Sequence, residues 1–540
     1  MKKTFLVLLT AICATANAQY TLLITFTGVA NGSNPTGSLI SDGTFLYGMT
    51  WTGGANNMGV IFKMMPDGTG YSKLLDFAGS NGIYPDGSLM SDGTYLYGMT
   101  RLGGTNNLGV IFKIMPDGTG YTKLLDFAGV ANGSYPTGSL ISDGTFLYGM
   151  AGRGGTNDLG VVFKIMPDGT GYSKLLDFTG TANGRSPWGS LVSDGTFLYG
   201  MTYGGGTNDM GVVFKIMPDG SGYTKLLDFA GATNGRQPYG TLVSDGTFLY
   251  GMTSDGGTNN MGVVFKILPD GTGYSTLLDF AGAANGSYPY NSFVSDGTFL
   301  YGMTRDGGTN NLGVIFKILP DGTGYSKLLD FAGVSNGSLP YGSLVSDGTF
   351  LYGMTHYGGA SEIGTVFRYC HTMPSVNLVL NPDTVCINAS VYALTGGSPS
   401  GGTYSGPGVS AGNFDPGVAG VGLHNIIYTY ADSNNCSNSD TVQILVDVCT
   451  GTQTVSANQS ISIFPNPSKG IFTLVFAGEA KQSQIEIYNL LGEKVAQNVF
   501  ANGAGNLEID LSDRPDGIYF LQIKTAQGEV VGNKKIIISK

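Results

Sequence analysis

Charged side chains are scarce in this chain: Asp, Glu, Lys and Arg together make up 12% of its 540 residues, about half the usual share of a soluble protein. A disordered chain carries dense charge and few aromatic residues, but 11% of the residues here are aromatic, so disorder is excluded. The formal net charge is −11. This acidic balance argues against nucleic acid and anionic membranes as partners.

Histidine and long apolar runs are also rare. The three histidines are His356, His371 and His424, and a nucleophilic triad or a histidine zinc site needs histidine close to its partners. We therefore assign no catalytic residue and expect neither a metal site nor a cofactor. Beyond the N-terminus, no run approaches the roughly 18 apolar residues of a membrane span, so we predict no transmembrane segment in the mature chain.

Glycine, in contrast, is abundant, with 88 glycines beside 21 prolines. This much glycine inside helices would cost about 1 kcal/mol per residue, and its spacing is not the strict third-residue period of collagen. The composition therefore predicts an all-β chain with many tight turns.

The first residues have the pattern of a secretory signal peptide. Lys2 and Lys3 precede a mainly apolar run, and Ala16-Asn17-Ala18 supplies a cleavage site of small residues, so we predict that residues 1–18 are removed. The four remaining cysteines favour disulfides, because an exported chain meets an oxidising environment.

The tripeptide Ser-Asp-Gly marks seven repeats. Its aspartate stands at positions 42, 92, 143, 194, 245, 296 and 347. In the third repeat, strands are predicted at about residues 138–142, 145–151, 160–166 and 172–178, and Asp143-Gly144 and Pro167-Asp168-Gly169 form turns between them. Four short strands repeated seven times predict a seven-bladed β-propeller over residues 19–371.

The two ends of the repeat region are offset. Residues 20–26 match the fourth strand of a repeat, whereas the seventh repeat stops after its third strand at residues 364–369. The N-terminal strand is therefore predicted to complete the last blade, which would close the ring and leave no open sheet edge. The rival is an open solenoid, but solenoid coils of this length usually carry a helix and need polar caps, and neither is visible.

The blocks DGTFLYGMT at residues 194–202 and GVVFK at residues 211–215, with the Gly-Gly pair between them, resemble the tandem GloVer repeat family. The resemblance covers about residues 20–370. It implies the repeat architecture and no agreed activity.

One face of the predicted ring carries the positions that differ between repeats. Strand direction alternates within a blade, so the loops after the second and fourth strands share this face. The candidate ligand-binding residues are Trp51, Arg101, Arg153, Trp188, Tyr203, Tyr239, Tyr290, Arg305, Tyr341 and His356. Aromatic rings beside arginines suit a polysaccharide or an extended peptide. The alternative is drift in exposed loops, with the aromatic rings packing between blades.

Six aspartates recur at one place in the fourth strand. They are Asp76, Asp126, Asp177, Asp228, Asp279 and Asp330. Such carboxylates can bind calcium or act in acid–base chemistry, so calcium is a possible ion without further support. A catalytic pair, however, needs two different environments, and equivalent copies instead predict one structural hydrogen bond per blade.

Residues 374–449 differ from the repeats in composition. Strand-like segments at 391–394 and 426–430 alternate with Pro/Gly/Ser turns, and the segments at 401–416 and 424–436 resemble immunoglobulin-like or PKD-like modules of bacterial surface proteins. We expect a β-sandwich that acts as a spacer. Four cysteines allow three pairings; the favoured one joins Cys386 to Cys436 and Cys370 to Cys449.

After a polar linker at residues 450–459, the last segment contains ISIFPNPSKGIFTL at 461–474, IEIYNLLGEKV at 485–495 and DLSDRPDGIYFLQI at 510–523. These blocks resemble the type A sorting domain of type IX secretion over residues 460–540. By resemblance, this domain is a small β-sandwich that engages the type IX secretion machinery. The protein would then be secreted or displayed on the outer-membrane surface of a Gram-negative bacterium.

Two functions remain open. The first is an exported binding or adhesion protein whose propeller face holds a polysaccharide or peptide. The second is a secreted hydrolase or lyase that acts on polysaccharide with carboxylates in the propeller channel. An enzyme should carry acids or a histidine at positions where the other repeats have different residues. Such unique residues are few, namely Asp86, Asp255, Asp306 and His356, which favours binding.

Overall fold

The computed structural model describes residues 19–449, 461–476, 483–500, 506–525 and 530–540. The predicted signal peptide and linker lie outside these residues. The described chain packs into two compact units. The first holds the residues up to Leu378 together with Gly397–Thr403 and Tyr428–Asp440. The second holds Val379–Gly396, Tyr404–Ile427 and the described residues from Thr441 onward.

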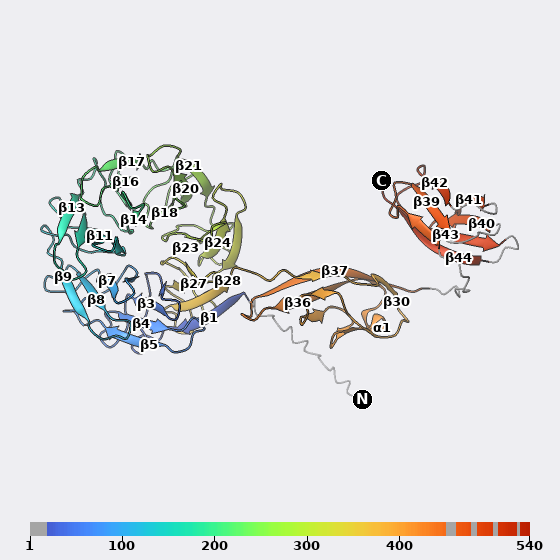
Figure 1. Cartoon of the computed structure of the whole chain (residues 1–540), viewed down its shortest axis with the longest axis horizontal. Helices are drawn as coiled ribbons and strands as arrows, with labels where there is room; N and C mark the ends of the chain where they lie inside the picture. Colours follow the sequence, from blue (N-terminus) through green and yellow to red (C-terminus); the bar gives the residue numbers. More distant parts are fainter. Residues whose placement is uncertain (1–18, 450–460, 477–482, 501–505, 526–529) are drawn as a thin grey trace, which may run out of the picture. The chain divides into compact units, whose positions relative to one another are not determined.

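Seven four-stranded antiparallel sheets surround one axis in the first unit (Figure 1). The innermost strands are β2 (Ile40–Ser41), β6 (Met90–Ser91), β10 (Ile141–Ser142), β14 (Val192–Ser193), β18 (Val243–Ser244), β22 (Val294–Ser295) and β26 (Val345–Ser346). The second strands are β3 (Leu46–Thr50), β7 (Leu96–Thr100), β11 (Leu147–Ala151), β15 (Leu198–Thr202), β19 (Leu249–Thr253), β23 (Leu300–Thr304) and β27 (Phe350–Thr355).

The outer half of each sheet follows the same order. The third strands are β4 (Val60–Met64), β8 (Val110–Ile114), β12 (Val161–Ile165), β16 (Val212–Ile216), β20 (Val263–Ile267), β24 (Val314–Ile318) and β28 (Thr365–Cys370). The outermost strands are β5 (Ser72–Asp76), β9 (Thr122–Asp126), β13 (Ser173–Asp177), β17 (Thr224–Asp228), β21 (Ser275–Asp279), β25 (Ser326–Asp330) and β1 (Tyr20–Thr25).

The prediction of a ring closed by the N-terminal strand is confirmed. β1 pairs antiparallel with β28, with Leu22 opposite Phe367 and Ile24 opposite Val366. The last sheet therefore has the order β1-β28-β27-β26, and Figure 1 shows β1 beside β28. Both edges that an open array would expose are used in this pairing.

Neighbouring sheets share their apolar cores. Tyr97 and Ile111 of one blade pack in the same cluster as Leu147 and Phe163 of the next. The second strands are buried along their whole length, and four of the five residues of β12 are buried. A strand that is apolar on both faces needs this cover on both sides, which explains why a single repeat cannot fold alone.

Short strands and one helix form the region between the ring and residue 449. They are β29 (Asn377–Leu378), β30 (Thr384–Cys386), β31 (Tyr392–Ala393), β32 (Gly397–Ser398), β33 (Thr403–Ser405), β34 (Val409–Ser410), β35 (Asn413–Phe414), α1 (Pro416–Ala419), β36 (Gly422–Ala431) and β37 (Ser437–Asp447). The assignment of residues 374–449 to an immunoglobulin-like module, and the domain boundaries, stay predictions.

The favoured disulfide pairing is wrong. Cys370 bonds to Cys436 with a Cα–Cα distance of 5.7 Å, and Cys386 bonds to Cys449 at 5.2 Å. β30 runs parallel to β37 and places Cys386 opposite Asp447. The 11 residues of β37 separate that end of the strand from Cys436, a length of about 36 Å, so Cys386 cannot reach Cys436.

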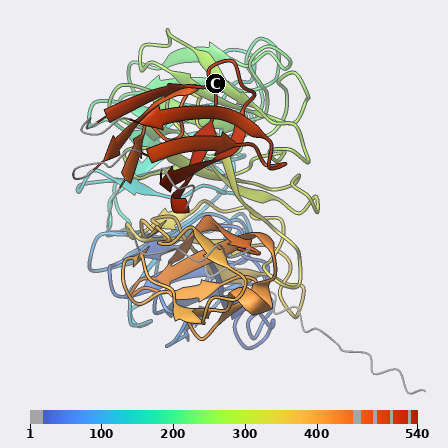
Figure 2. The ribbon, with the colours of Figure 1, turned by 90° about the vertical axis from the view of Figure 1, so that its right-hand side faces the viewer.

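The C-terminal residues form two sheets, shown in red in Figure 2. One sheet contains β38 (Ile461–Phe464), β39 (Ile471–Phe476) and β42 (Asn506–Asp510); the other contains β40 (Ser483–Tyr488), β41 (Lys494–Phe500), β43 (Gly517–Thr525) and β44 (Val530–Ile538). Phe472 and Leu474 from the first sheet share a buried cluster with Ile485 and Leu521 from the second. This is the small β-sandwich that the sequence predicts.

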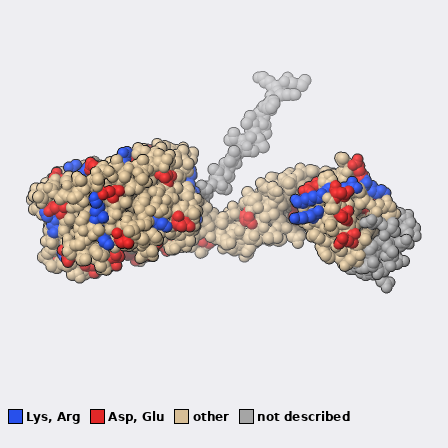
Figure 3. All heavy atoms as spheres, turned by 90° about the horizontal axis from the view of Figure 1, so that it is seen from above, with Lys and Arg blue, Asp and Glu red and all other residues tan. Residues whose placement is uncertain are grey.

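The surface of the ring carries few charges. On the face seen in Figure 3, the basic and acidic side chains of the ring are scattered among uncharged residues and lie interspersed with one another. Within the described residues, no helix is long and apolar enough to cross a membrane.

Candidate functional site

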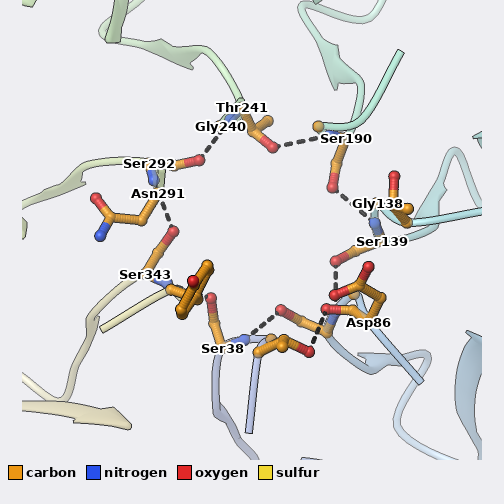
Figure 4. Close-up of a pocket in the computed structure, with 18 of the residues that line it drawn as sticks. Ser38, Asp86, Gly138, Ser139, Ser190, Gly240, Thr241, Asn291, Ser292 and Ser343 are labelled. Atoms are coloured by element: carbon orange, nitrogen blue, oxygen red, sulfur yellow. Dashed lines mark hydrogen bonds between the residues drawn. The ribbon is translucent and has the colours of Figure 1, made fainter. Parts of the chain in front are cut away.

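A ring of seven hydroxyl groups surrounds the propeller axis. In each blade, the backbone N–H of a Ser or Thr donates to the side-chain oxygen of the equivalent residue in the next blade, at 2.6–2.9 Å. We call this set the hydroxyl ring; it consists of Ser38, Ser88, Ser139, Ser190, Thr241, Ser292 and Ser343 (Figure 4). The bond from Ser343 to Ser38 measures 2.7 Å and closes the circle.

The residue before each member of the hydroxyl ring explains how closely the blades approach. Six blades have glycine there, and a Cβ on Gly37 would lie 2.3 Å from the carbonyl oxygen of Gly87. Such a contact is impossible without a shift of the backbone. The sixth blade has Asn291 at this position, so it alone places a side chain in this layer.

A cavity of about 170 Å³ opens at this ring. Seven equivalent positions, each two residues before a member of the hydroxyl ring, line it together with Arg101. We call these residues the axial mouth; they are Thr36, Asp86, Thr137, Trp188, Tyr239, Tyr290 and Tyr341, with Arg101. Four consecutive blades supply aromatic rings and the other three supply Thr, Asp and Thr, so one side of the mouth is aromatic and the other is polar.

The aromatic residues contact one another along the mouth, some stacked and some tilted. Ring centroids are 4.1 Å apart between Trp188 and Tyr203, 4.4 Å between Trp188 and Tyr239, and 4.3 Å between Tyr239 and Tyr290. Tyr290 continues to Tyr341 at 5.6 Å. Trp188 and Tyr203, which come from two different loops, therefore meet on one face, as the alternation of strand direction predicts.

Two arginines lie beside this row. Arg101 Nη1 is 3.7 Å from Asp86 Oδ2. Arg305 donates to the Tyr290 hydroxyl at 2.7 Å, and its guanidinium lies over the Tyr290 ring at 4.7 Å. It also pairs with Asp306 at 2.6 Å. Burial raises the pKa of Asp86, and the charge of Arg101 opposes that increase only in part.

His356 and Trp51 continue the row of rings. The His356 ring is 4.8 Å from Tyr341 and 6.1 Å from Trp51. His356 is 5% exposed, and its Nδ1 lies 3.2 Å from the carbonyl oxygen of Pro35. Because a carbonyl oxygen only accepts, Nδ1 carries the hydrogen. Burial lowers the pKa of His356 to about 4, so the imidazole is neutral at pH 7.

Arg153 does not lie at the axial mouth. Its side chain is 62% exposed and is 3.9 Å from Asp158. Arg153 stands one residue after the position that Trp51, Arg101 and Tyr203 occupy in their own repeats, where the third repeat has Gly152. The shift by one residue turns the side chain away from its neighbours in other blades.

The six repeated aspartates accept the structural hydrogen bonds that the sequence predicts. Asp126 accepts from the backbone N–H and the hydroxyl of Thr105, at 2.9 and 3.0 Å, and pairs with Lys123 at 2.8 Å. The bond from the backbone N–H recurs at the other five positions. Across the described residues, no group of three or more His, Cys, Asp or Glu side chains is arranged to hold a metal ion.

Asn291 and the hydroxyl ring are absent from the predicted site residues, and Asp86 is predicted only as an acid unique to one repeat. Alignment of the seven repeats at a step of 50 or 51 residues is the signal that finds them: Asn291 then replaces a glycine, and Asp86 falls in register with Trp188. Chemically, the mouth offers hydroxyl groups, one carboxylate, one guanidinium and aromatic rings, which suits reversible binding of a polar ligand.

Comparisons with known proteins agree with the repeat and the sorting domain. Residues 12–157, 141–267 and 243–417 match the model of the Gloeobacter/Verrucomicrobia repeat. Residues 462–539 match the Secretion system C-terminal sorting domain. The second match indicates export by type IX secretion to the cell surface or the secreted space, and it implies an interaction with that secretion machinery. The comparison with curated proteins gives no match.

Solved structures show only a distant likeness. The extracellular domain described for a one-component system of B. thetaiotaomicron has 11% identity and a TM-score of 0.44, covering 97% of this chain and 58% of that chain. A puromycin-hydrolyzing peptidase of Mycobacterium tuberculosis has 12% identity and a TM-score of 0.44, covering 76% and 61%. A fungal alcohol oxidase in complex with copper has 10% identity and a TM-score of 0.42, covering 95% and 98%. The chain spans less than two thirds of the length of the first two.

Proposed function

This chain belongs to the Gloeobacter/Verrucomicrobia repeat family, and from that premise we propose that it is an exported binding protein whose propeller face holds a polysaccharide or a peptide. Its sorting domain at residues 462–539 takes it to the place where such ligands occur. Residues 374–449 then act as a spacer.

One observation carries the proposal: the seven equivalent positions of the axial mouth differ between blades and line one cavity. The turns on the opposite face repeat the same contacts in every blade, such as the hydrogen bond from the Tyr47 hydroxyl to Asp42 and its six equivalents. Uniform turns on one face, with varied side chains around a cavity on the other, are what a binding platform requires.

Binding of the exported protein to glycan and peptide arrays tests this proposal. The double variant Trp188→Ala/Tyr239→Ala should weaken binding at least about tenfold, since it removes two aromatic anchors. Phe146→Ala is the matched control, because Phe146 packs at 4.6 Å under Lys164 beside the opposite turns. Wild-type protein that binds nothing on either array would refute the proposal, as would equal loss in the control.

A second candidate is the hydrolase or lyase with a carboxylate acid in the channel. The raised pKa of the half-buried Asp86 favours it, because an acid must hold its proton until it donates it. Asp86 is, however, the only carboxylate among the residues that line the cavity. Release of reducing sugar that Asp86→Asn abolishes would support this candidate over binding alone.

A further inference from the structure

The second blade supplies both charged residues of the axial mouth. Asp86 stands where the other blades have threonine or an aromatic residue, and Arg101 follows from the next variable loop of the same blade. Figure 4 shows Asp86 at the edge of the opening that the hydroxyl ring surrounds. The side chains of Arg101 and Asp86 are 45% and 22% exposed, so a ligand in the cavity can reach both.

These two side chains leave hydrogen-bonding capacity unused. Arg101 Nη1 lies 3.7 Å from Asp86 Oδ2, which is farther than the roughly 2.7–2.9 Å of a hydrogen bond between charged groups. Arg185, in contrast, donates to both carboxylate oxygens of Asp209 at 2.8 and 2.9 Å. Burial raises the pKa of Asp86, and Arg101 and Thr36 compensate its carboxylate only in part. A donor and an acceptor therefore remain available on one wall of the cavity.

The separation of the pair limits which ligands can use both groups. Because Asp86 and Arg101 lie only 3.7 Å apart, the ligand must present a donor and an acceptor on the same edge. A trans peptide group directs its N–H and C=O in opposite directions, so a peptide backbone meets only one of the two. A lone carboxylate or ammonium group meets one like charge. Two neighbouring hydroxyl groups of a sugar ring fit, since one donates to Asp86 and the other accepts from Arg101.

The rest of the lining suits a sugar ring as well. Ser88 and Ser139 each accept one backbone N–H, at 2.7 and 2.8 Å, and their own hydroxyl hydrogens have no acceptor within the described residues. Such a hydroxyl group can donate to a ligand and still accept from it. Trp188 and Tyr239 line the same cavity and offer apolar surface to the C–H groups of a sugar. The charged pair is thus surrounded by groups that a neutral polyol can contact.

We propose that the Asp86–Arg101 pair binds two neighbouring free hydroxyl groups of a neutral polysaccharide, with the Asp86 carboxylate accepting from one and the Arg101 guanidinium donating to the other. This inference rests on the proposed function and narrows it to glycans that carry such a diol. A polysaccharide whose linkages block the diol should bind weakly, even when it is built from the same sugar.

The test uses the exported protein on an array of neutral polysaccharides and peptides. Cello-oligosaccharides, amylose and mannan carry free neighbouring hydroxyl groups in every residue, whereas long curdlan chains carry them only at the chain end. Wild type should bind at least one of the first three at least about tenfold more tightly than curdlan. Mild periodate, which cleaves the carbon–carbon bond between neighbouring free hydroxyl groups, should abolish that binding.

Variants copied from other blades separate this contact from packing. Asp86→Thr introduces the side chain that the first and third blades have there, at Thr36 and Thr137, and Arg101→Ser introduces that of Ser254. Each should weaken glycan binding at least about tenfold, because a hydrogen bond to a charged group is lost, while the Tm stays close to that of wild type. Arg153→Ala is the control outside the mouth and should bind like wild type.

Tight binding to curdlan, or glycan binding that survives periodate or both mouth variants, would overturn the diol inference and leave the proposed function standing. Binding confined to peptides, including those that present the primary amide of asparagine or glutamine, would do the same. A large loss of Tm in Asp86→Thr and Arg101→Ser with unchanged glycan binding would show a structural role and also overturn it. Absence of binding to any glycan or peptide would overturn both.

Discussion

One position of the repeat carries a different side chain in several of the blades, and these differences give the axial mouth its chemistry. Thr36, Asp86, Trp188 and Tyr239 occupy the same place in four different blades, and closure of the ring turns this series into one surface. The contact between the tilted rings of Trp188 and Tyr239 means that both also stabilise the blades, so Trp188→Ala/Tyr239→Ala should lower the Tm as well as the affinity.

His356 makes the stability of the ring depend on pH. Its folded pKa of about 4 lies below the ordinary value of 6.5, so between these values the unfolded chain binds the proton and the folded chain does not. Stability is therefore lost as the pH falls from about 6.5 to about 4, by about 3 kcal/mol in full. Denaturant unfolding of wild type and His356→Gln at pH 7 and pH 4 measures this loss; an equal decrease in both proteins would contradict it.

At the scale of the strand and turn, an aspartate fixes each inner hairpin. Asp143 accepts from the backbone N–H groups of Thr145 and Phe146, at 2.8 and 2.7 Å, and from the hydroxyl of Tyr148 at 2.7 Å. Burial alone would raise its pKa, but the hydrogen bonds from Phe146, Tyr148 and Thr145 lower it. This is the structural role that the Asp-Gly pattern predicts.

Asp143→Ala should therefore destabilise the ring by about 2 kcal/mol, because three hydrogen bonds to one charged group are lost. Tyr148→Phe should cost about 1 kcal/mol, since it removes only one of them. Equilibrium unfolding of both variants at pH 7 gives the two values. A larger cost for Tyr148→Phe than for Asp143→Ala would contradict this account of the turn.

Most of the fold could be predicted from the sequence because the repeat encodes it. Apolar runs between turn residues, with the Asp-Gly turns, predict the four strands of each blade, and the observed inner strand is only shorter, Ile141–Ser142 against the predicted residues 138–142. Within residues 138–140, Ser139 belongs to the hydroxyl ring and Leu140 packs in the apolar core between blades. Those contacts join residues about 51 positions apart, so no local pattern reveals them, and the same reason hid Asn291.

At the scale of the whole molecule, the choice of disulfide partners depends on which distant strands pair with each other. Sequence alone could not give the parallel pairing of β30 with β37, which decides that Cys386 meets Cys449. Peptide mapping of the non-reduced protein by mass spectrometry should find the pairs Cys370–Cys436 and Cys386–Cys449. A peptide that joins Cys386 to Cys436 would contradict the strand order of this region.

Export depends on the C-terminal sandwich. Deletion of residues 460–540 should leave the rest of the protein in the periplasm, because the matched sorting domain lies within them. Cell fractionation beside the full chain, with protease accessibility of intact cells, measures the location. Normal surface display or secretion of the truncated chain would refute the assignment of this domain.

The site exists only if the ring is closed, since an open array would separate the residues of the mouth. Amide hydrogen exchange of β1 and β28 tests the closure most directly. The paired amides of Leu22–Thr25 and Thr365–Tyr369 should exchange as slowly as those of β12 and β13, which form the equivalent pair in a blade built from one continuous repeat. Exchange of β1 at the rate of an unpaired segment, with β12 and β13 still protected, would contradict a closed seven-bladed ring.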